Sequence, residues 1–253
     1  MAVTLSELNK ELEALLRPEQ FKDYCPNGLQ VQGGDQIEKL VTGVTASQAL
    51  LDAACIAGAD AILVHHGYFW QGEDQRIKGS KRRRLKTLLD HEMSLFAFHL
   101  PLDVHARFGN NVELAKILDI VIEGDLKKQN NHPLVLKGRL LEPMSNHNFE
   151  KLITEKLGRI PQTIEGAAAN IETIAWCTGA AQNYIDLAIE AEVDAYLTGE
   201  ISEQTYHAAK ESGLHFFGAG HHATERYGVQ ALGAYLAEKF SIEHCFIDID
   251  NPV

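Results

Sequence analysis

A run of three apolar segments between residues 41 and 64 restricts the fold more than any other feature of the chain. Val41–Val44 and Ala61–Val64 are short runs of the kind found in buried strands, and the Ala- and Leu-rich segment Ser47–Ala57 between them has the length of a helix. A strand, a helix and a strand in this order form a βαβ unit, whose two strands run parallel. The sequence therefore predicts an α/β fold built around a parallel sheet.

A similar pattern returns 134 positions later in the chain. Seven residues are identical at that offset, in a window without gaps: Gln48 and Gln182, Asp52 and Asp186, Ala54 and Ala188, Ala57 and Ala191, Asp60 and Asp194, Ala61 and Ala195, Leu63 and Leu197. We therefore expect an internal pseudo-repeat, with two similar, interlinked α/β lobes at residues 1–124 and 125–253. The polar stretch between Gly124 and Pro133 is typical of a join, and the boundary is approximate because both halves can contribute segments to one site.

The composition excludes several classes of protein. Hydrophobic residues make up 45% of the chain and charged residues 23%, which is the usual mixture of a globular protein and not that of a disordered chain, a collagen or a coiled coil. No segment approaches the roughly 20 apolar residues of a membrane span, so we expect no membrane partner. The net charge of -12 disfavours nonspecific binding to nucleic acid. Widely spaced cysteines and the lack of a secretory leader favour the cytoplasm.

Histidines and carboxylates gather where three apolar strands are expected to end: His65 and His66 after the first, His99, Asp103 and His105 after the second, His221, His222 and Glu225 after the third. Neighbouring side chains of a regular strand point to opposite faces. His65 and His66 therefore serve one site only where the chain leaves the pleat, a departure that Gly67 permits. His221 and Glu225 are four residues apart on an expected helix, where they would share one face.

Five of these residues form a plausible set of metal ligands: His65, His66, Asp103, His221 and Glu225. Open α/β sheets bind ligands beyond the carboxyl ends of their strands, where all three clusters are expected. Imidazole and carboxylate ligands suit Zn, Mn, Fe, Ni or Co and do not make a soft thiolate site. One tetrahedral ion needs three or four protein ligands, so five predict two divalent metal ions bridged by carboxylate and water. A lone histidine at a strand end, by contrast, is more often structural.

These motifs resemble a known family. The segments Val64–Gly67, His99–Asp103 and Gly220–Arg226, together with Pro26–Val31 and Phe246–Asp248, are similar to the GTP cyclohydrolase I type 2 homologues, also called the NGG-interacting-factor-three-like family. The resemblance implies a cytoplasmic protein of two α/β lobes that assembles as a homohexameric ring with a dinuclear metal centre in each subunit. Its ligands fall on the same five residues. The family pattern also has a histidine at His99, which implies that this residue supports a metal ligand or acts as an acid or base; a structural role is the alternative.

Three functions remain open on this sequence. The first is a metal-dependent hydrolase acting on a nucleotide or a related heterocycle; the family name implies opening of the guanine ring of GTP. The second is a phosphoesterase or nuclease, in which a basic run could hold the phosphates: Arg76, Lys78, Lys81, Arg82, Arg83, Arg84 and Lys86. That run is also typical of a solvated helix face or a subunit contact, and the chain has no P-loop. The third is a ring without enzymatic activity that stores metal or binds partners.

Overall fold

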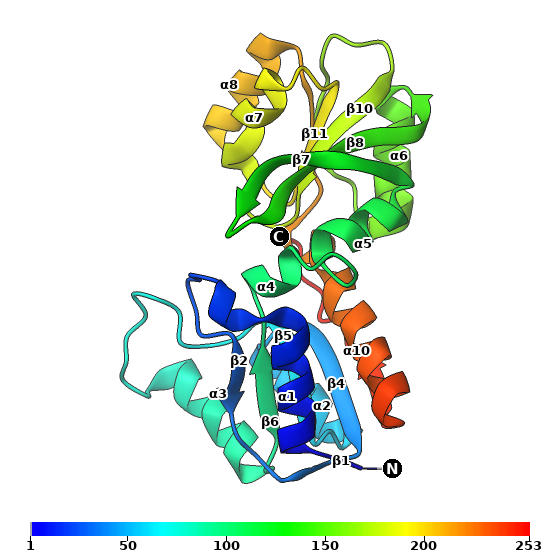
Figure 1. Cartoon of the computed structure of the whole chain (residues 1–253). Helices are drawn as coiled ribbons and strands as arrows, with labels where there is room; N and C mark the ends of the chain where they lie inside the picture. The colour runs from blue at the N-terminus through cyan, green and yellow to red at the C-terminus, as the bar shows by residue number, and fades with distance from the viewer. Residues whose placement is uncertain (1) are drawn as a thin grey trace. The chain divides into compact units, whose positions relative to one another are not determined.

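The computed structural model describes residues 2–253, and within them the chain divides into two compact units (Figure 1). Unit 1 consists of residues 2–102 and 228–250, and unit 2 of residues 103–227 and 251–253. The chain is α/β, as the sequence predicts, and each unit has its own main sheet. Two helices contain the division points: α4 (Leu100–Asp103) and α10 (Arg226–Phe240).

Unit 1 is built on a five-stranded sheet in the order β13-β4-β5-β6-β2, in which only β2 runs antiparallel to its neighbour. Leucines of α2 and α3 pack on one face of this sheet. On the other face, Gly233 of α10 approaches Thr42 too closely for any side chain to fit. The α1 helix lies along α10, where the Tyr235 hydroxyl donates to Glu11 at 2.8 Å. The elements are β1 (Val3–Thr4), α1 (Leu5–Leu16), a 3-10 turn (Pro18–Gln20), β2 (Gly28–Val31), β3 (Gln36–Ile37), β4 (Lys39–Thr45), α2 (Gln48–Ala57), β5 (Ala61–His66), α3 (Gly79–Asp90), β6 (Ser94–Ala97) and β13 (Glu243–Phe246).

Unit 2 is built on a six-stranded sheet in the order β7-β8-β10-β11-β12-β9, with β10, β11 and β12 parallel. The α5 and α6 helices pack on one face, where the rings of Phe149 and Phe217 meet edge to face at 5.0 Å. Figure 1 shows α7 and α8 on the other side of the sheet. The elements are α5 (Asn110–Ile117), β7 (Ile120–Gln129), β8 (His132–Met144), α6 (Asn146–Leu157), β9 (Gln162–Ile164), β10 (Ile171–Cys177), a 3-10 turn (Gln182–Tyr184), α7 (Ile185–Glu190), β11 (Ala195–Thr198), α8 (Glu203–Ser212), β12 (His215–Gly218) and α9 (His221–Thr224).

The internal repeat is visible in both topology and hydrogen bonding. The order β4-β5-β6-β2 in unit 1 corresponds to β10-β11-β12-β9 in unit 2, and each series ends on an antiparallel edge strand. The carboxylate of Asp60 accepts the backbone N–H groups of residues 38 and 39, at 2.8 and 2.9 Å. Asp194, which matches it in the repeat, accepts those of residues 172 and 173, at 3.0 and 2.8 Å. The same residue therefore fixes the start of the same strand in both units.

The contacts divide the chain at other positions than the boundary expected at residues 124 and 125. Residues 103–124 belong to unit 2 because β7 pairs with β8 along that unit's sheet. Residues 228–250 belong to unit 1 because β13 pairs in parallel with β4, about 200 residues earlier in the chain. Asp103, assigned to the first lobe on sequence, consequently lies in unit 2.

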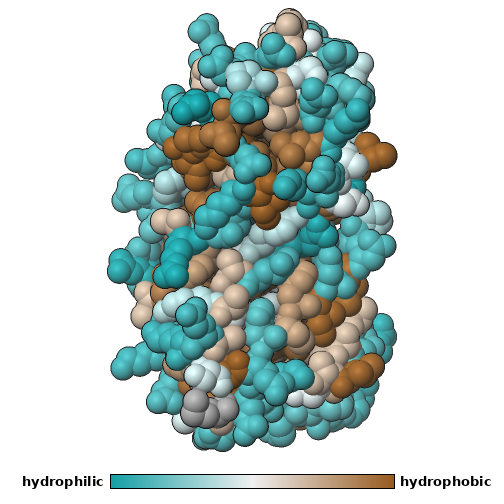
Figure 2. Space-filling model, turned by 90° about the vertical axis from the view of Figure 1, so that its right-hand side faces the viewer, coloured by the Kyte–Doolittle hydropathy of each residue, from teal (hydrophilic) through white to brown (hydrophobic). Residues whose placement is uncertain are grey.

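Among residues 2–253, no helix has both the length and the apolar character needed to cross a bilayer. The face drawn in Figure 2 is mainly hydrophilic, with apolar side chains gathered in a few places among the polar ones. The most exposed large aliphatic side chains of the described residues are Ile56 at 89%, Ile160 at 70% and Leu141 at 64%.

Candidate metal centre

Unit 1 contributes three imidazoles that lie close together at the carboxyl ends of neighbouring strands. His65 and His66 are the last residues of β5, and His99 follows β6. The ring centroid of His65 lies 4.5 Å from that of His66 and 5.1 Å from that of His99. One ring nitrogen of each lies within 4.8 Å of the other two, a spacing that can hold a metal ion. The two rings therefore lie side by side, as a shared site would require.

The sequence suggested that the chain leaves the strand to bring these two rings together. In the structure it does not, because both residues are still part of β5. β5 extends through His66, but its pairing with β6 ends earlier, at Val64 and Ala97. Among residues 2–253, β5 therefore has no strand on that side beyond Val64. The last two residues of β5 are thus paired on one side only, next to β4. An end of a strand that is held on one side follows the strand twist more freely than a strand inside the sheet.

A hydrogen bond at Nδ1 fixes the orientation of each of these imidazoles. His65 Nδ1 donates to the carbonyl oxygen of Phe98 at 2.9 Å, and His66 Nδ1 lies 3.1 Å from the Thr45 hydroxyl. Metal-binding histidines are held in this way, because an acceptor on one ring nitrogen directs the other nitrogen toward the ion. His65 is fully buried, whereas His66 is partly exposed.

His99 is held by a buried carboxylate. Its Nδ1 lies 2.7 Å from Asp23 Oδ1, and the side chain of Asp23 is 2% exposed. The other carboxylate oxygen accepts the N–H of Leu100 and the side-chain amide of Asn27. Burial, the largest influence, would raise the pKa of Asp23, but the hydrogen bond and charge of His99 outweigh it and the pKa is lowered. The ionised Asp23 thus favours the His99 tautomer that carries its proton on Nδ1.

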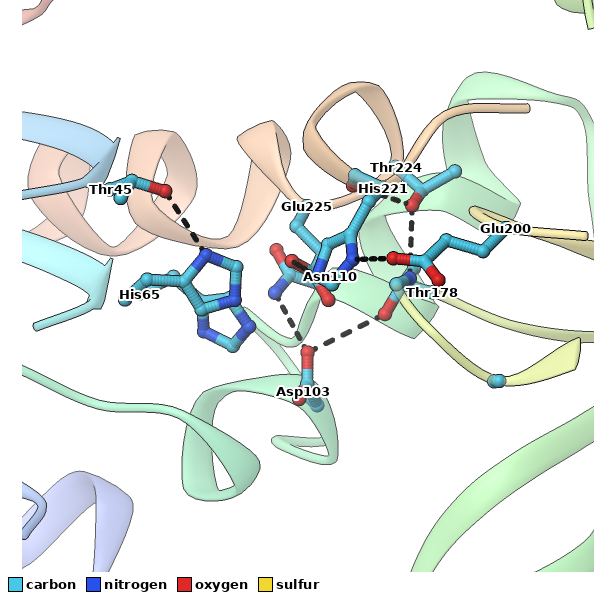
Figure 3. A network of polar contacts seen from close by, with 12 residues as sticks. Thr45, His65, Asp103, Asn110, Thr178, Glu200, His221, Thr224 and Glu225 are labelled. Carbon is cyan, nitrogen blue, oxygen red and sulfur yellow. Dashed lines mark hydrogen bonds and ion pairs between the residues drawn. The ribbon is translucent and has the colours of Figure 1, made fainter. Parts of the chain in front are cut away.

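Unit 2 holds the other members of the predicted set, namely two carboxylates and the imidazole of His221. Asp103 is 6% exposed, and its Oδ1 accepts from the side chain of Asn110 at 2.9 Å and from the Thr178 hydroxyl at 3.5 Å (Figure 3). Glu225 is 3% exposed, and one of its carboxylate oxygens lies within 4.8 Å of one of Asp103. His221 Nε2 lies 3.0 Å from Glu225 Oε2. Two buried carboxylates this close repel each other unless a cation lies nearby.

The His221-Glu225 contact forms without the continuous helix that the sequence suggested. The α9 helix ends at Thr224, and Glu225 is its C-terminal cap, with φ -112° and ψ 12°. A new helix, α10, begins at Arg226. The spacing of four residues therefore gives the expected contact within a single helical turn.

Glu200 completes the surroundings of His221. This residue follows β11, and its Oε1 lies 2.7 Å from His221 Nδ1 (Figure 3). Burial, the largest influence, would lower the pKa of His221, but the hydrogen bonds and charges of Glu225 and Glu200 outweigh it and raise that pKa to about 9. A metal ion would take the place of the proton on Nε2, while Glu200 keeps the bond to Nδ1.

The close approach of Glu225 to the backbone requires a glycine at position 179. Gly179 has φ +67°, a conformation that L side chains rarely adopt, and a Cβ there would collide with the Glu225 carboxylate. The N–H of Gly179 donates to the Thr224 hydroxyl at 3.0 Å, which ties the two segments together. The loop after β10 is therefore shaped around the carboxylate.

Sequence reasoning missed two residues that orient the predicted ones. Asp23 holds His99 from 76 positions away, and no local pattern indicates such a contact. Glu200 had a usable signal, because the repeat offset of 134 places it at the position of His66. His66 ends the parallel strand β5 and Glu200 comes two residues after the parallel strand β11, so the repeat itself marks Glu200 as a candidate.

Acidic neighbours pair with much of the basic run Arg76–Lys86. Asp74 lies 2.9 Å from both Arg76 and Lys78, Glu73 lies 3.1 Å from Lys81, and Lys86 pairs with Asp90. Arg84 lies over the Tyr68 ring, with its guanidinium carbon 6.0 Å from the ring centroid. Arg82 and Arg83 are exposed on α3. These ion pairs make the run more typical of a solvated helix face than of a phosphate-binding site.

Known proteins are similar to this chain over nearly its whole length. The family described as Duf34/NIF3 (NGG1p interacting factor 3) matches residues 3–252. A protein of Pseudomonas aeruginosa named "GTP cyclohydrolase 1 type 2 homolog" is 57% identical over 252 residues, covering 100% of both chains. A protein of Escherichia coli K12 with the same name is 49% identical over 249 residues, covering 96% of this chain and 99% of its own.

Solved structures show the same fold. One described as protein ybgI, of unknown function, has a TM-score of 0.95 at 48% identity and covers 99% of this chain and 100% of its own. Reduced HcgD from Methanocaldococcus jannaschii has a TM-score of 0.83 at 22% identity, with 99% of both chains covered, and supports the fold alone. The resemblance found in the histidine motifs is confirmed, and the chain belongs to the Duf34/NIF3 (NGG1p interacting factor 3) family.

Proposed function

We propose that this protein is a metal-dependent hydrolase that binds two divalent metal ions through His65, His66, Asp103, His221 and Glu225. The observation that carries the proposal is the hydrogen bond at Nδ1 of every imidazole in this set, which leaves Nε2 as the nitrogen directed to an ion. The substrate class is a nucleotide or a related heterocycle. Zn, Mn, Fe, Ni and Co all suit these ligands, and availability selects among them.

The residues present fit divalent metal ions in three ways. Their donors are imidazole nitrogens and carboxylate oxygens, which bind borderline and hard cations. The carboxylates of Asp103 and Glu225 are buried, so a nearby cation would offset the cost of keeping both ionised. Imidazoles and carboxylates are also better prepared than the nearby Cys25 thiol, because burial, followed by the charge of Asp23, raises the pKa of Cys25 to about 12.

The catalytic step would use His99 as the residue that moves a proton. Two divalent cations, when bound, lower the pKa of a coordinated water and stabilise negative charge on a substrate oxygen. Asp23 holds the proton on Nδ1 of His99, so Nε2 is available to accept a proton and later to return it to a leaving group. Glu200 keeps His221 oriented throughout, because its bond to Nδ1 does not depend on what Nε2 contacts.

GTP is the first substrate to test, because the names of the curated relatives contain GTP cyclohydrolase. Opening of a guanine ring with loss of a carbon releases formate, whereas a phosphoesterase or nuclease releases phosphate or cleaved strands. The ion pairs of the basic run disfavour a nuclease, because they leave fewer cations to bind the repeated phosphates of a nucleic-acid strand.

The proposal is tested by metal analysis followed by a hydrolase screen. Protein purified without chelator or affinity metal is expected to contain two ions per chain, and reconstituted protein to act on at least one nucleotide or heterocycle in the screen. His66→Ala and Glu225→Gln should lose metal and activity together. His207→Ala and Glu203→Gln, on the exposed surface of α8, are matched controls. Activity that persists in folded His66→Ala and Glu225→Gln proteins would exclude the proposed centre.

We also propose that the protein acts in the cytoplasm as a homohexamer, as its family resemblance implies. The exposed aliphatic side chains Ile56, Leu141 and Ile160 are compatible with subunit contacts. Mass measurement in solution tests the assembly. A ring that binds metal but gives no product with any substrate would instead support a storage or partner-binding role.

A further inference from the structure

We propose that Tyr24 and Trp70 form a stacking platform for a planar heteroaromatic ring beside His99. The Trp70 ring meets that of His99 edge to face at 5.1 Å between centroids and lies 6.0 Å from that of His66. The Tyr24 ring meets His99 at 6.3 Å, also edge to face. All four residues belong to unit 1, so the arrangement depends on this unit alone.

The two loops that carry these rings are fixed to each other. Gln30 donates to the carbonyl oxygens of Pro26 and Tyr68 and accepts the N–H of Tyr68, at 2.8, 3.0 and 2.7 Å. The N–H of Gln71, the residue after Trp70, donates to the carbonyl oxygen of Tyr24 at 2.6 Å. The backbone of the two loops is therefore held in place before any ligand arrives, which reduces the entropy lost on binding.

Folding alone does not account for these side chains. Tyr24 is 62% exposed, so its ring contributes little buried area to unit 1. Phe69, next to Trp70, has φ +66°, a strained conformation for a bulky residue. Strained backbone of this kind is concentrated at functional sites, where the surrounding structure compensates for its cost.

The polar groups of these loops indicate the class of ligand. The Trp70 indole N–H donates to the carbonyl oxygen of Gly67 at 3.1 Å. The side-chain amide of Asn27 donates to Asp23 and accepts the N–H of His99. Gln30 is likewise bonded at both ends. A sugar needs several converging polar groups, and these are already engaged. What the loops offer is the aromatic surface of two rings, which suits a flat heterocycle such as a nucleobase or a pterin.

This inference rests on the proposed function only for the nature of the ligand, and its test needs no turnover. The probes are guanosine, adenosine, pterin and inorganic triphosphate, added to metal-free protein while tryptophan emission is recorded. Trp176, a second tryptophan, is fully buried, so Trp70 should report the binding. We expect the three heterocycles to quench emission and triphosphate to leave it unchanged. Trp70→Phe should remove the quenching while calorimetry still detects binding, because the phenyl ring preserves stacking.

Substitutions that remove a ring should weaken binding of the heterocycles about fivefold to one-hundredfold, the range measured for stacking of a base on an aromatic side chain. Trp70→Leu and Tyr24→Leu are the test variants, and Tyr206→Leu, which removes a 46% exposed tyrosine in unit 2, is the matched control. Equal affinity in all three variants, or no binding of any heterocycle at millimolar concentration, would overturn the platform. Binding of the heterocycles without hydrolysis would support the platform and contradict the proposed reaction. Hydrolysis that is unaffected by the ring variants would support the reaction and contradict the platform.

Discussion

Replacing Glu200 tests whether His221 is a metal ligand, because Glu200 touches His221 on the side away from Glu225. Its Oε1 lies 2.7 Å from His221 Nδ1, whereas Glu225 Oε2 contacts Nε2. Glu200→Gln keeps an oxygen that can accept the Nδ1 proton and removes the negative charge. Glu200→Ala removes the acceptor altogether. The two variants thus separate the contribution of charge from that of orientation.

The expected loss of affinity follows from the exposure of Glu200. Loss of a residue that supports a metal-binding histidine costs about 10-fold to 100-fold in affinity, which corresponds to about 1.4 to 2.7 kcal/mol. The Glu200 side chain is 33% exposed, so solvent screens its charge and Glu200→Gln should fall at the lower end, near tenfold. Glu200→Ala should approach the upper end of that range, because the imidazole of His221 can then rotate about its side-chain bonds.

Competition with a chromophoric chelator measures these affinities at one fixed pH. Glu203→Gln is the matched control, since Glu203 is exposed in the first turn of α8 only three residues away. The order of affinity should be wild type and Glu203→Gln, then Glu200→Gln, then Glu200→Ala. If both Glu200 variants bind metal as tightly as wild type while Glu225→Gln does not, His221 is not held for a metal and the assignment fails.

Three further outcomes are expected. Gly179→Ala should destabilise the fold by about 1 to 2 kcal/mol through its positive φ, and should also displace the Glu225 carboxylate, seen as lost metal in calorimetry. Asp60→Ala and Asp194→Ala should each cost about 1 to 3 kcal/mol in urea unfolding, since each leaves two backbone N–H groups without their acceptor; a large difference between them would contradict the repeat. Burial lowers the pKa of His244 below its usual 6.5. The neutral His244 therefore contributes its full stability above pH 6.5, and this contribution is lost as the pH falls below that value. In urea unfolding, His244→Gln should show a smaller loss of stability at acid pH than wild type.

The parts of the site that the sequence predicted are those set by local rules. Parallel strands bring their carboxyl ends to one edge of a sheet, so apolar runs followed by histidines were enough to select His65, His66 and His99. The spacing of His221 and Glu225 was enough to predict their contact, even though α9 ends between them. Neither inference needed to know which strands are neighbours.

The parts that the sequence did not predict depend on contacts between distant segments. The division into units depends on β13, which pairs with β4 through residues such as Cys245 and Val41. The sequence of its four residues, which follow a helix, does not indicate the strand with which they pair. The bond between Asp23 and His99 likewise joins an irregular loop to the end of β6. Periodicity describes which face of an element is buried, and it contains no information on the identity of the partner.

The repeat explains why ligands and their supporting residues occupy equivalent places. Asp60 and Asp194 fix the start of the same strand in each unit, so the residues at the far end of the next strand are positioned alike. In unit 1 that position is His66, a proposed ligand, and in unit 2 it is Glu200, which holds the proposed ligand His221. One structural position thus serves two chemical purposes, because an imidazole there can bind an ion directly, whereas a carboxylate there can orient a neighbouring imidazole. A histidine in place of Glu200 would remove the negative charge that favours the proton on His221 Nδ1, and Glu200→His should bind metal more weakly than wild type although it adds a potential ligand.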